Sequence, residues 1–297
     1  MSIRATITKI VIKQKRKKQI NKNPKGKRFF VPRKKKRPVE VYLYEPKQNM
    51  GKKYPVMFNV HGGAWVGCDA SMLDTQSMEM AEHLGAYVVN INYTKIDIQP
   101  FPYPQEEIRD VVLYFATHAE EYGVDRERFN LIGYSAGGHL CAGAAILLRD
   151  IGFSLRSQVL CYPFLDFTKG FKDVKLENNS KSLKVINEIF FLNGVDKSNL
   201  INSPSHTEPE KLKGLAPAII IASQKDSLYE HATDYKIHLE TAGVKVIWKE
   251  YENAVHGFLE VNHPEYKYDV AKTQEQAEIA KECECFIKEQ LEEIWNS

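Results

Sequence analysis

The sequence alternates short, mostly apolar runs with longer amphipathic stretches, and this alternation constrains the fold more than any other feature. Strands that are apolar along their whole length are buried on both faces, which is typical of parallel sheets covered by helices. The sequence therefore predicts an α/β fold, with a mostly parallel central sheet flanked by helices. The expected strands are 39–44, 54–60, 86–92, 130–134, 157–162, 218–223 and 244–251, and the expected helices are 72–84, 104–122, 136–148, 229–242 and 268–291.

One long stretch, 167–214, interrupts this alternation. It is rich in Asn, Lys and Ser and holds only short apolar pieces. Because a compact domain seldom carries so long a structureless loop, we expect a small helical insertion there. The catalytic domain would then consist of 39–166 and 215–297, which suits the length of the chain.

The net charge of +3 conceals a strong asymmetry. Residues 1–38 hold 16 Lys and Arg and no acidic residue, whereas the rest of the chain holds 25 basic and 38 acidic residues. Such a basic segment could bind nucleic acid, but no recognition motif accompanies the charge. We therefore expect the basic segment to fold onto the acidic body or to be solvated, and we expect no nucleic-acid partner.

Composition excludes several classes of protein. Hydrophobic residues make up 43% and charged residues 27% of the chain, as in ordinary globular proteins. No apolar run reaches the roughly 18 residues of a membrane span, and the N-terminus lacks the apolar block of a secretory signal. Five cysteines are too few and odd in number for a disulfide framework, which favours reduced thiols. We expect a cytoplasmic protein without a membrane span, and a homo-oligomer is left open.

The string GYSAG at 133–137 lies between an expected strand and an expected helix. A serine hydroxyl is a weak nucleophile that must be presented and deprotonated. In this setting the serine sits on a sharp turn, with a glycine two residues away on each side to leave room. The N-terminus of the following helix favours developing negative charge. Ser135 is thus the expected nucleophile.

The string HGGAW at 61–65 follows the first expected buried strand of the parallel sheet. A tetrahedral intermediate carries an oxyanion that is stabilised by backbone N–H donors. Gly62 and Gly63 are expected to supply two donors, and Ala136, after the nucleophile, a third. His61 is expected to hold this loop in place, not to transfer protons.

Two further polar residues follow strands near the C-terminus. Asp226 comes just after the strand 218–223, and His256 comes just after the strand 244–251. Open α/β sheets place their sites at the carboxyl ends of the strands, so both side chains are expected there. His256 would accept the serine proton, and Asp226 would fix the tautomer of the histidine and stabilise its charged form. The order Ser135, Asp226, His256 along the chain agrees with this fold.

These motifs together resemble the α/β-hydrolase superfamily and, within it, the hormone-sensitive-lipase-like carboxylesterase and acetyl esterase family. The resemblance covers about two thirds of the chain. It rests on HGG at 61–63, Asn92-Tyr93, Pro100-Phe101-Pro102, GYSAGG at 133–138, Tyr162-Pro163, Asp226 and HGF at 256–258. The chain departs from the family at Ala64, where a third glycine is usual, at Thr94, where an arginine is common, and in the loop 95–99.

The resemblance implies a serine esterase with a cap formed by the N-terminal segment and by 167–214. We expect hydrolysis of short-chain, acetyl-type esters through an acyl-enzyme, with no metal or organic cofactor. The side chains that could line the substrate pocket are Tyr134, Phe164, Phe191 and Phe258, although core packing is an equal alternative. An arylformamidase-like amidase, a small serine peptidase and a ligand-binding protein on a hydrolase scaffold remain as other functions.

Overall fold

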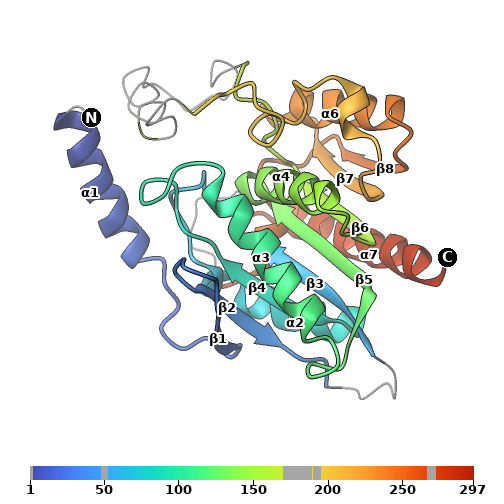
Figure 1. The fold of residues 1–297 in the computed structure, drawn as a ribbon. Coiled ribbons are helices and arrows are strands. Elements are labelled where there is room, and N and C mark those ends of the chain that lie inside the picture. The colour runs from blue at the N-terminus through green and yellow to red at the C-terminus, as the bar shows by residue number, and fades with distance from the viewer. Residues whose placement is uncertain (1–2, 48–52, 170–188, 190–194, 266–271) are drawn as a thin grey trace.

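A central sheet organises the protein (Figure 1). The computed structural model describes residues 3–47, 53–169, 189, 195–265 and 272–297. Within these residues eight strands form one sheet, in the order β1-β2-β4-β3-β5-β6-β7-β8. The strands are β1 (Lys27–Val31), β2 (Val39–Tyr44), β3 (Tyr54–Val60), β4 (Tyr87–Asn92), β5 (Val124–Tyr134), β6 (Ser157–Cys161), β7 (Ala218–Ser223) and β8 (Val246–Tyr251).

The sheet is mostly parallel, as the sequence predicts. Strands β4, β3, β5, β6, β7 and β8 pair in parallel, whereas β1 pairs with β2, and β2 with β4, in antiparallel fashion. Alternate side chains along β3 show why this strand is mostly apolar. Val56 and Phe58 pack into the core on one face, and Met57 packs into the core on the other.

Helices cover both faces of the sheet, which completes the predicted α/β fold. The helices are α1 (Ile3–Lys17), α2 (Asp74–Leu84), α3 (Tyr103–Thr117), α4 (Ala136–Asp150), α6 (Tyr229–Thr241) and α7 (Gln274–Asn296), with short 3-10 turns at Ala70–Leu73, Pro209–Leu212 and Phe258–Asn262. Buried residues of α3, α4 and α6 share one core, and those of α2 and α7 share the other. No helix in the described ranges has both the length and the apolar character needed to cross a membrane.

The first strand, β1, is absent from the expectations. Four of its five residues are exposed or half-buried, and only Val31 is fully buried, because β1 is an edge strand of the sheet. Its sequence therefore lacks the apolar run that marks the inner strands. The sheet consequently begins inside the segment 1–38, which was expected to lie outside the catalytic domain. The expected helix 268–291 corresponds to α7, and 266–271 lie outside the described residues.

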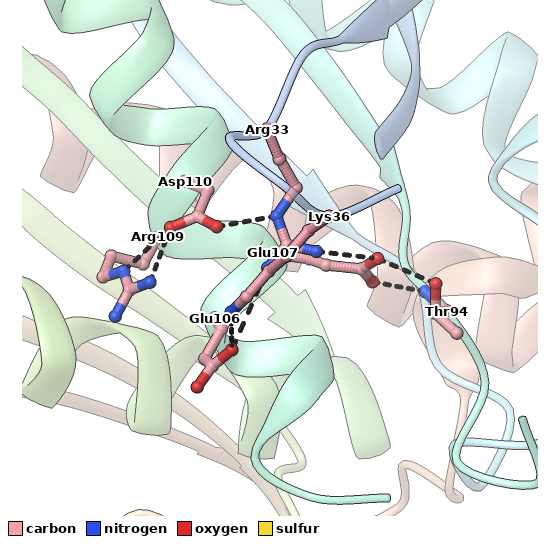
Figure 2. Close-up of polar contacts among 7 residues, drawn as sticks. All are labelled: Arg33, Lys36, Thr94, Glu106, Glu107, Arg109 and Asp110. Atoms are coloured by element: carbon pink, nitrogen blue, oxygen red, sulfur yellow. Dashed lines mark hydrogen bonds and ion pairs between the residues drawn. The ribbon is translucent and has the colours of Figure 1, made fainter. Parts of the chain in front are cut away.

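The basic N-terminal segment packs onto the acidic body. Arg16 pairs with Asp97 at 2.8 Å, and Arg33 pairs with Asp110 at 2.6 Å. Figure 2 shows Arg33 and Lys36 reaching the acidic side of α3, with Glu107 turned to the loop after β4. The Arg33 side chain is only 1% exposed and that of Asp110 is 22% exposed, so this ion pair is a part-buried contact and not a solvated one.

Replacement of Arg33 by methionine is expected to lower the free energy of unfolding by about 3 kcal/mol, because removing one partner leaves buried carboxylates without their cation. Glu107, which is 1% exposed, lies 3.5 Å from the guanidinium and would be affected most. Lys36→Met is the matched control. Its side chain is 39% exposed, so the expected loss is below about 1 kcal/mol. Denaturant unfolding measures both, and equal losses would contradict the buried role of Arg33.

Candidate active site

The expected nucleophile lies on a strained turn between β5 and α4. Ser135 has φ 53° and ψ −116°, a region that residues with a Cβ rarely adopt. Its backbone N–H donates to Cys161 O at 2.9 Å. A Cβ on Gly133 would lie 2.3 Å from Gly137 O, and one on Gly137 would lie 2.1 Å from Val60 O. Both glycines are therefore required for the turn to fit against β3 and α4.

The structure brings Ser135, His256 and Asp226 together. His256 Nε2 lies 2.9 Å from Ser135 Oγ, and His256 Nδ1 lies 2.6 Å from Asp226 Oδ2. Asp226 follows β7 and His256 follows β8, so the carboxyl ends of parallel strands deliver both side chains. The Asp226 side chain is 2% exposed, whereas that of His256 is 43% exposed. The arrangement thus places an open histidine above a buried carboxylate.

Asp226 sets the protonation of His256. Loss of water around the His256 ring lowers its pKa, but the hydrogen bond to Asp226 and the charge of Asp226 more than offset this effect. The charge of buried Glu260 adds to it, and the pKa of His256 is raised as a result. The other carboxylate oxygen of Asp226 accepts the backbone N–H of Leu228 at 3.0 Å, which fixes the carboxylate in one orientation.

The glycine loop after β3 lies against the nucleophile. A Cβ on Gly62 would lie 3.4 Å from Ser135 Cβ and 3.0 Å from Tyr134 O. Within the described part of the chain, no acceptor takes the backbone N–H of Gly62, Gly63 or Ala136. These three N–H groups are the expected oxyanion donors, and Gly62 and Ala136 directly adjoin Ser135.

His61 contacts the backbone of this loop and not the catalytic serine. Its side chain is fully buried, and Nδ1 lies 2.6 Å from Gly62 O. Burial, aided by the charge of Lys95, lowers the pKa of His61 well below its ordinary value, so the ring is neutral. The geometry agrees with the expectation that His61 holds the loop.

A second buried histidine, His139, joins three segments around the site. Trp65 Nε1 donates to His139 Nδ1 at 3.0 Å, and His139 Nε2 donates to Asn202 O at 2.9 Å. Burial lowers the pKa of His139 to about 3, so this ring is also neutral. His139 is not among the site residues expected from the sequence. Its place four residues after Ser135 on α4 was the available signal, and its partners are visible only in the fold.

The aromatic residues expected to line the substrate pocket are mainly core residues. Phe164 is 3% exposed and packs against Trp65, with ring centroids 5.0 Å apart. Phe258 is fully buried between Tyr162 and Tyr251. Tyr134, 2% exposed, lines a cavity of about 360 Å³ between α2 and α7. Phe191 lies outside the described residues.

The rings next to the motifs therefore support the backbone, and they offer a substrate little surface. The burial of Phe164 and Phe258 favours the alternative of core packing, and their part in a substrate pocket stays a prediction. Across the described ranges, no three His, Cys, Asp or Glu side chains gather in a way that could hold a metal ion.

Comparisons with known proteins agree with this fold. Residues 57–260 match the family described as alpha/beta hydrolase fold. An esterase of Fusarium pseudograminearum is 26% identical over 235 residues, which cover 75% of this chain and 72% of that protein. An arylesterase of Saccharolobus solfataricus has the same identity and coverage. An arylacetamide deacetylase of Bos taurus is 27% identical over 288 residues, covering 74% of this chain and 72% of that protein.

Solved structures show the same architecture. The esterase of Pyrobaculum calidifontis superposes with a TM-score of 0.79 at 22% identity, covering 99% of this chain and 92% of that one. A structure from a study of two fungal esterases of Rhizomucor miehei has a TM-score of 0.79 at 22% identity, covering 98% of this chain and 90% of that one. At this identity the likeness concerns the fold alone. Since the family match spans well over half of the chain, from β3 to the turn after His256, the protein belongs to the α/β-hydrolase family.

Proposed function

We propose that this protein is a serine esterase that hydrolyses short-chain, acetyl-type carboxylic esters through an acyl-enzyme on Ser135. The observation that carries the proposal is the position of the His256 ring, in hydrogen-bond distance of both Ser135 Oγ and Asp226 Oδ2. Relatives named esterase and arylesterase support ester chemistry.

Acylation begins with attack of Ser135 Oγ on the ester carbonyl carbon. His256 Nε2 accepts the serine proton, and Asp226 stabilises the imidazolium that forms. The carbonyl oxygen becomes an oxyanion, for which Gly62, Gly63 and Ala136 supply N–H donors. The tetrahedral intermediate collapses, the C–O bond to the alcohol breaks, and His256 returns the proton to the departing alcohol.

Deacylation repeats these steps with water. His256 Nε2 accepts a proton from water as the water oxygen attacks the acyl carbon. The second oxyanion forms at the same N–H donors. When the bond to Ser135 Oγ breaks, the proton on His256 returns to the serine, and the carboxylic acid leaves.

Hydrolysis of p-nitrophenyl esters from acetyl to dodecanoyl tests the substrate class. We expect activity to peak at acetyl or butyryl and to fall for longer chains. A maximum at decanoyl or dodecanoyl would contradict the short-chain part of the proposal. Absence of activity across the series would contradict ester hydrolysis itself.

Amide hydrolysis is a second candidate, and the match to arylacetamide deacetylases of Bos taurus and Oryctolagus cuniculus favours it. The same three side chains would serve, with an amine as the leaving group. The ratio of kcat/KM for an aryl acetate to that for the matching aryl acetamide separates the two. A higher kcat/KM for the aryl acetamide than for the aryl acetate would identify the protein as an amidase.

The pH dependence of kcat/KM follows from the pKa of His256. The histidine must be neutral to accept the serine proton, and Asp226 raises its pKa above the ordinary value of 6.5. Activity is therefore expected to be half-maximal at a pH above 6.5 and to fall about tenfold for each pH unit below that point. A profile measured with p-nitrophenyl acetate checks this, and a midpoint below 6.5 would contradict it.

The division into a catalytic domain, 39–166 and 215–297, and a cap insertion, 167–214, also stays a proposal. Half of the insertion, 170–188 and 190–194, lies outside the described residues. Its described part includes Asn202, which accepts the hydrogen bond from His139 on α4, and Ser203, whose Oγ accepts the backbone N–H of Phe167. These contacts place that part beside the helix that begins at the nucleophile.

A further inference from the structure

A buried lysine lies behind the glycine loop. Lys95, just after β4, is only 4% exposed, and none of the acidic side chains in the described ranges forms an ion pair with it. Its Nζ lies 2.9 Å from His61 Nε2, 2.8 Å from Tyr93 O and 3.2 Å from Asn92 Oδ1. An ammonium has three N–H donors and no acceptor, so these three neighbours satisfy it fully. A buried charge without an ionic partner is costly, and such groups concentrate at functional sites.

Donor and acceptor can be assigned in the two hydrogen bonds that link Lys95 to His61 and His61 to Gly62 O. Gly62 O can only accept, so His61 Nδ1 must carry the ring proton. Because the His61 ring is neutral, its Nε2 then has a free lone pair and must accept from Lys95. The ammonium of Lys95 thus matches the one tautomer of His61 that can hold Gly62 O.

The peptide group between Gly62 and Gly63 links the buried hydrogen bonds of Gly62 O to the direction of the Gly63 N–H. In a trans peptide the C=O and the next N–H point in opposite directions. Tyr93 Oη also lies 3.3 Å from Gly62 O, and its ring stacks on His61 with centroids 4.5 Å apart. With Gly62 O held on the buried side by two donors, the N–H of Gly63 faces the other way.

We propose that Lys95 is a positioning residue for the oxyanion hole. Its ammonium fixes the His61 tautomer, and His61 holds the Gly62–Gly63 peptide with its N–H directed at the substrate oxygen. The inference rests on the proposed function, because it assigns a role within the same site.

This role makes activity sensitive to alkaline pH. Burial lowers the pKa of Lys95 to about 8. Neutral Lys95 has only two N–H donors for three acceptors, and it no longer requires an acceptor at His61 Nε2. We therefore expect kcat to decline as the pH rises through about 8. The charged or titratable groups around Lys95 are His61, Tyr93, Asp69, Cys68, Arg16 and Glu107.

Lys95→Met tests the role by removing the donors while keeping a side chain of similar length. Loss of a full oxyanion donor costs about 10²–10³ in kcat, so a misdirected donor is expected to cost at least roughly tenfold. KM should change less than about twofold, since the ground-state ester depends little on this N–H. Lys95→Gln, which keeps an N–H donor without the charge, should recover part of the loss. Lys213→Met, at a side chain that is 58% exposed, is the matched control.

The alkaline decline in kcat separates positioning from mere structural support. It should be present in the unaltered protein and absent in Lys95→Met. Unchanged kcat and an unchanged alkaline decline in the variant would overturn the proposal. Equal changes in kcat and KM with a lower unfolding midpoint would also overturn it, because they indicate a structural role alone.

Two further outcomes complete the test. If Lys95→Met does not fold, the pH profile of kcat of the unaltered protein tests the proposal instead. A kcat that stays constant from about pH 7 to 9 would exclude the role of Lys95. If Ser135→Ala keeps its activity, the proposed function fails, whatever Lys95 does. Dependence on Ser135 without dependence on Lys95 rejects the present inference alone.

Discussion

Ser135→Ala is expected to lower kcat roughly 10⁶-fold, the loss found when the nucleophile of a serine hydrolase is removed. The variant lacks the oxygen that forms the acyl-enzyme, and His256 then has no hydroxyl to deprotonate. The fold should be retained, because alanine has the same Cβ and meets the same backbone requirements at φ 53°. Steady-state hydrolysis of p-nitrophenyl acetate measures the loss, and thermal unfolding confirms that the variant is folded.

The matched control for this prediction is Ser154→Ala. Ser154 is exposed and lies between α4 and β6, away from the turn that carries Ser135. It should keep the activity of the unaltered protein. Activity of Ser135→Ala within about tenfold of that level would show that hydrolysis does not proceed through this serine.

Asp226→Asn is expected to lower kcat about 10⁴-fold. Leu228 N–H donates to the carboxylate oxygen Oδ1, so an asparagine at 226 must place its amide oxygen there. The amide NH₂ would then face His256 Nδ1 and donate to it. His256 would carry its proton on Nε2, the atom that must accept from Ser135, and general base catalysis would fail.

Asp150→Asn provides the comparison, because this aspartate is 51% exposed and, among the residues that the structure describes, pairs only with neighbouring Arg149. We expect no change in its kcat. A loss of less than about tenfold in Asp226→Asn would contradict the assigned role. It would mean that the proton moves without help from this carboxylate.

The inner strands could be predicted because burial on both faces leaves a continuous apolar run in the sequence. The strand expected at 218–223 coincides with β7, every residue of which is buried. Strand β1 gave no such signal, since one residue alone is fully buried in it. Its place in the sheet depends on pairing with β2, a tertiary contact that leaves no local pattern.

The site shows the same difference between local and distant information. Ser135 and the glycine loop lie in compact motifs whose spacing reflects a turn, so they could be predicted. Lys95 could not, because its role depends on His61, 34 residues earlier in the chain. His139 likewise depends on Asn202, 63 residues later. Single side chains that join distant segments have no spacing to detect.

At Ser135, the requirements of stability and of activity conflict. The positive φ strains the backbone of a residue with a Cβ, but the chemistry needs the serine hydroxyl. A backbone in this sparsely populated region costs a residue with a Cβ on the order of 1–3 kcal/mol, which a glycine would largely avoid. Random change selected for stability alone would therefore tend to replace the serine and lose the hydroxyl. Selection for the chemistry must act continuously to keep Ser135 in place. Glycine at this position would relieve the strain but remove the nucleophile, so the hydroxyl is the reason for a strained residue at this turn.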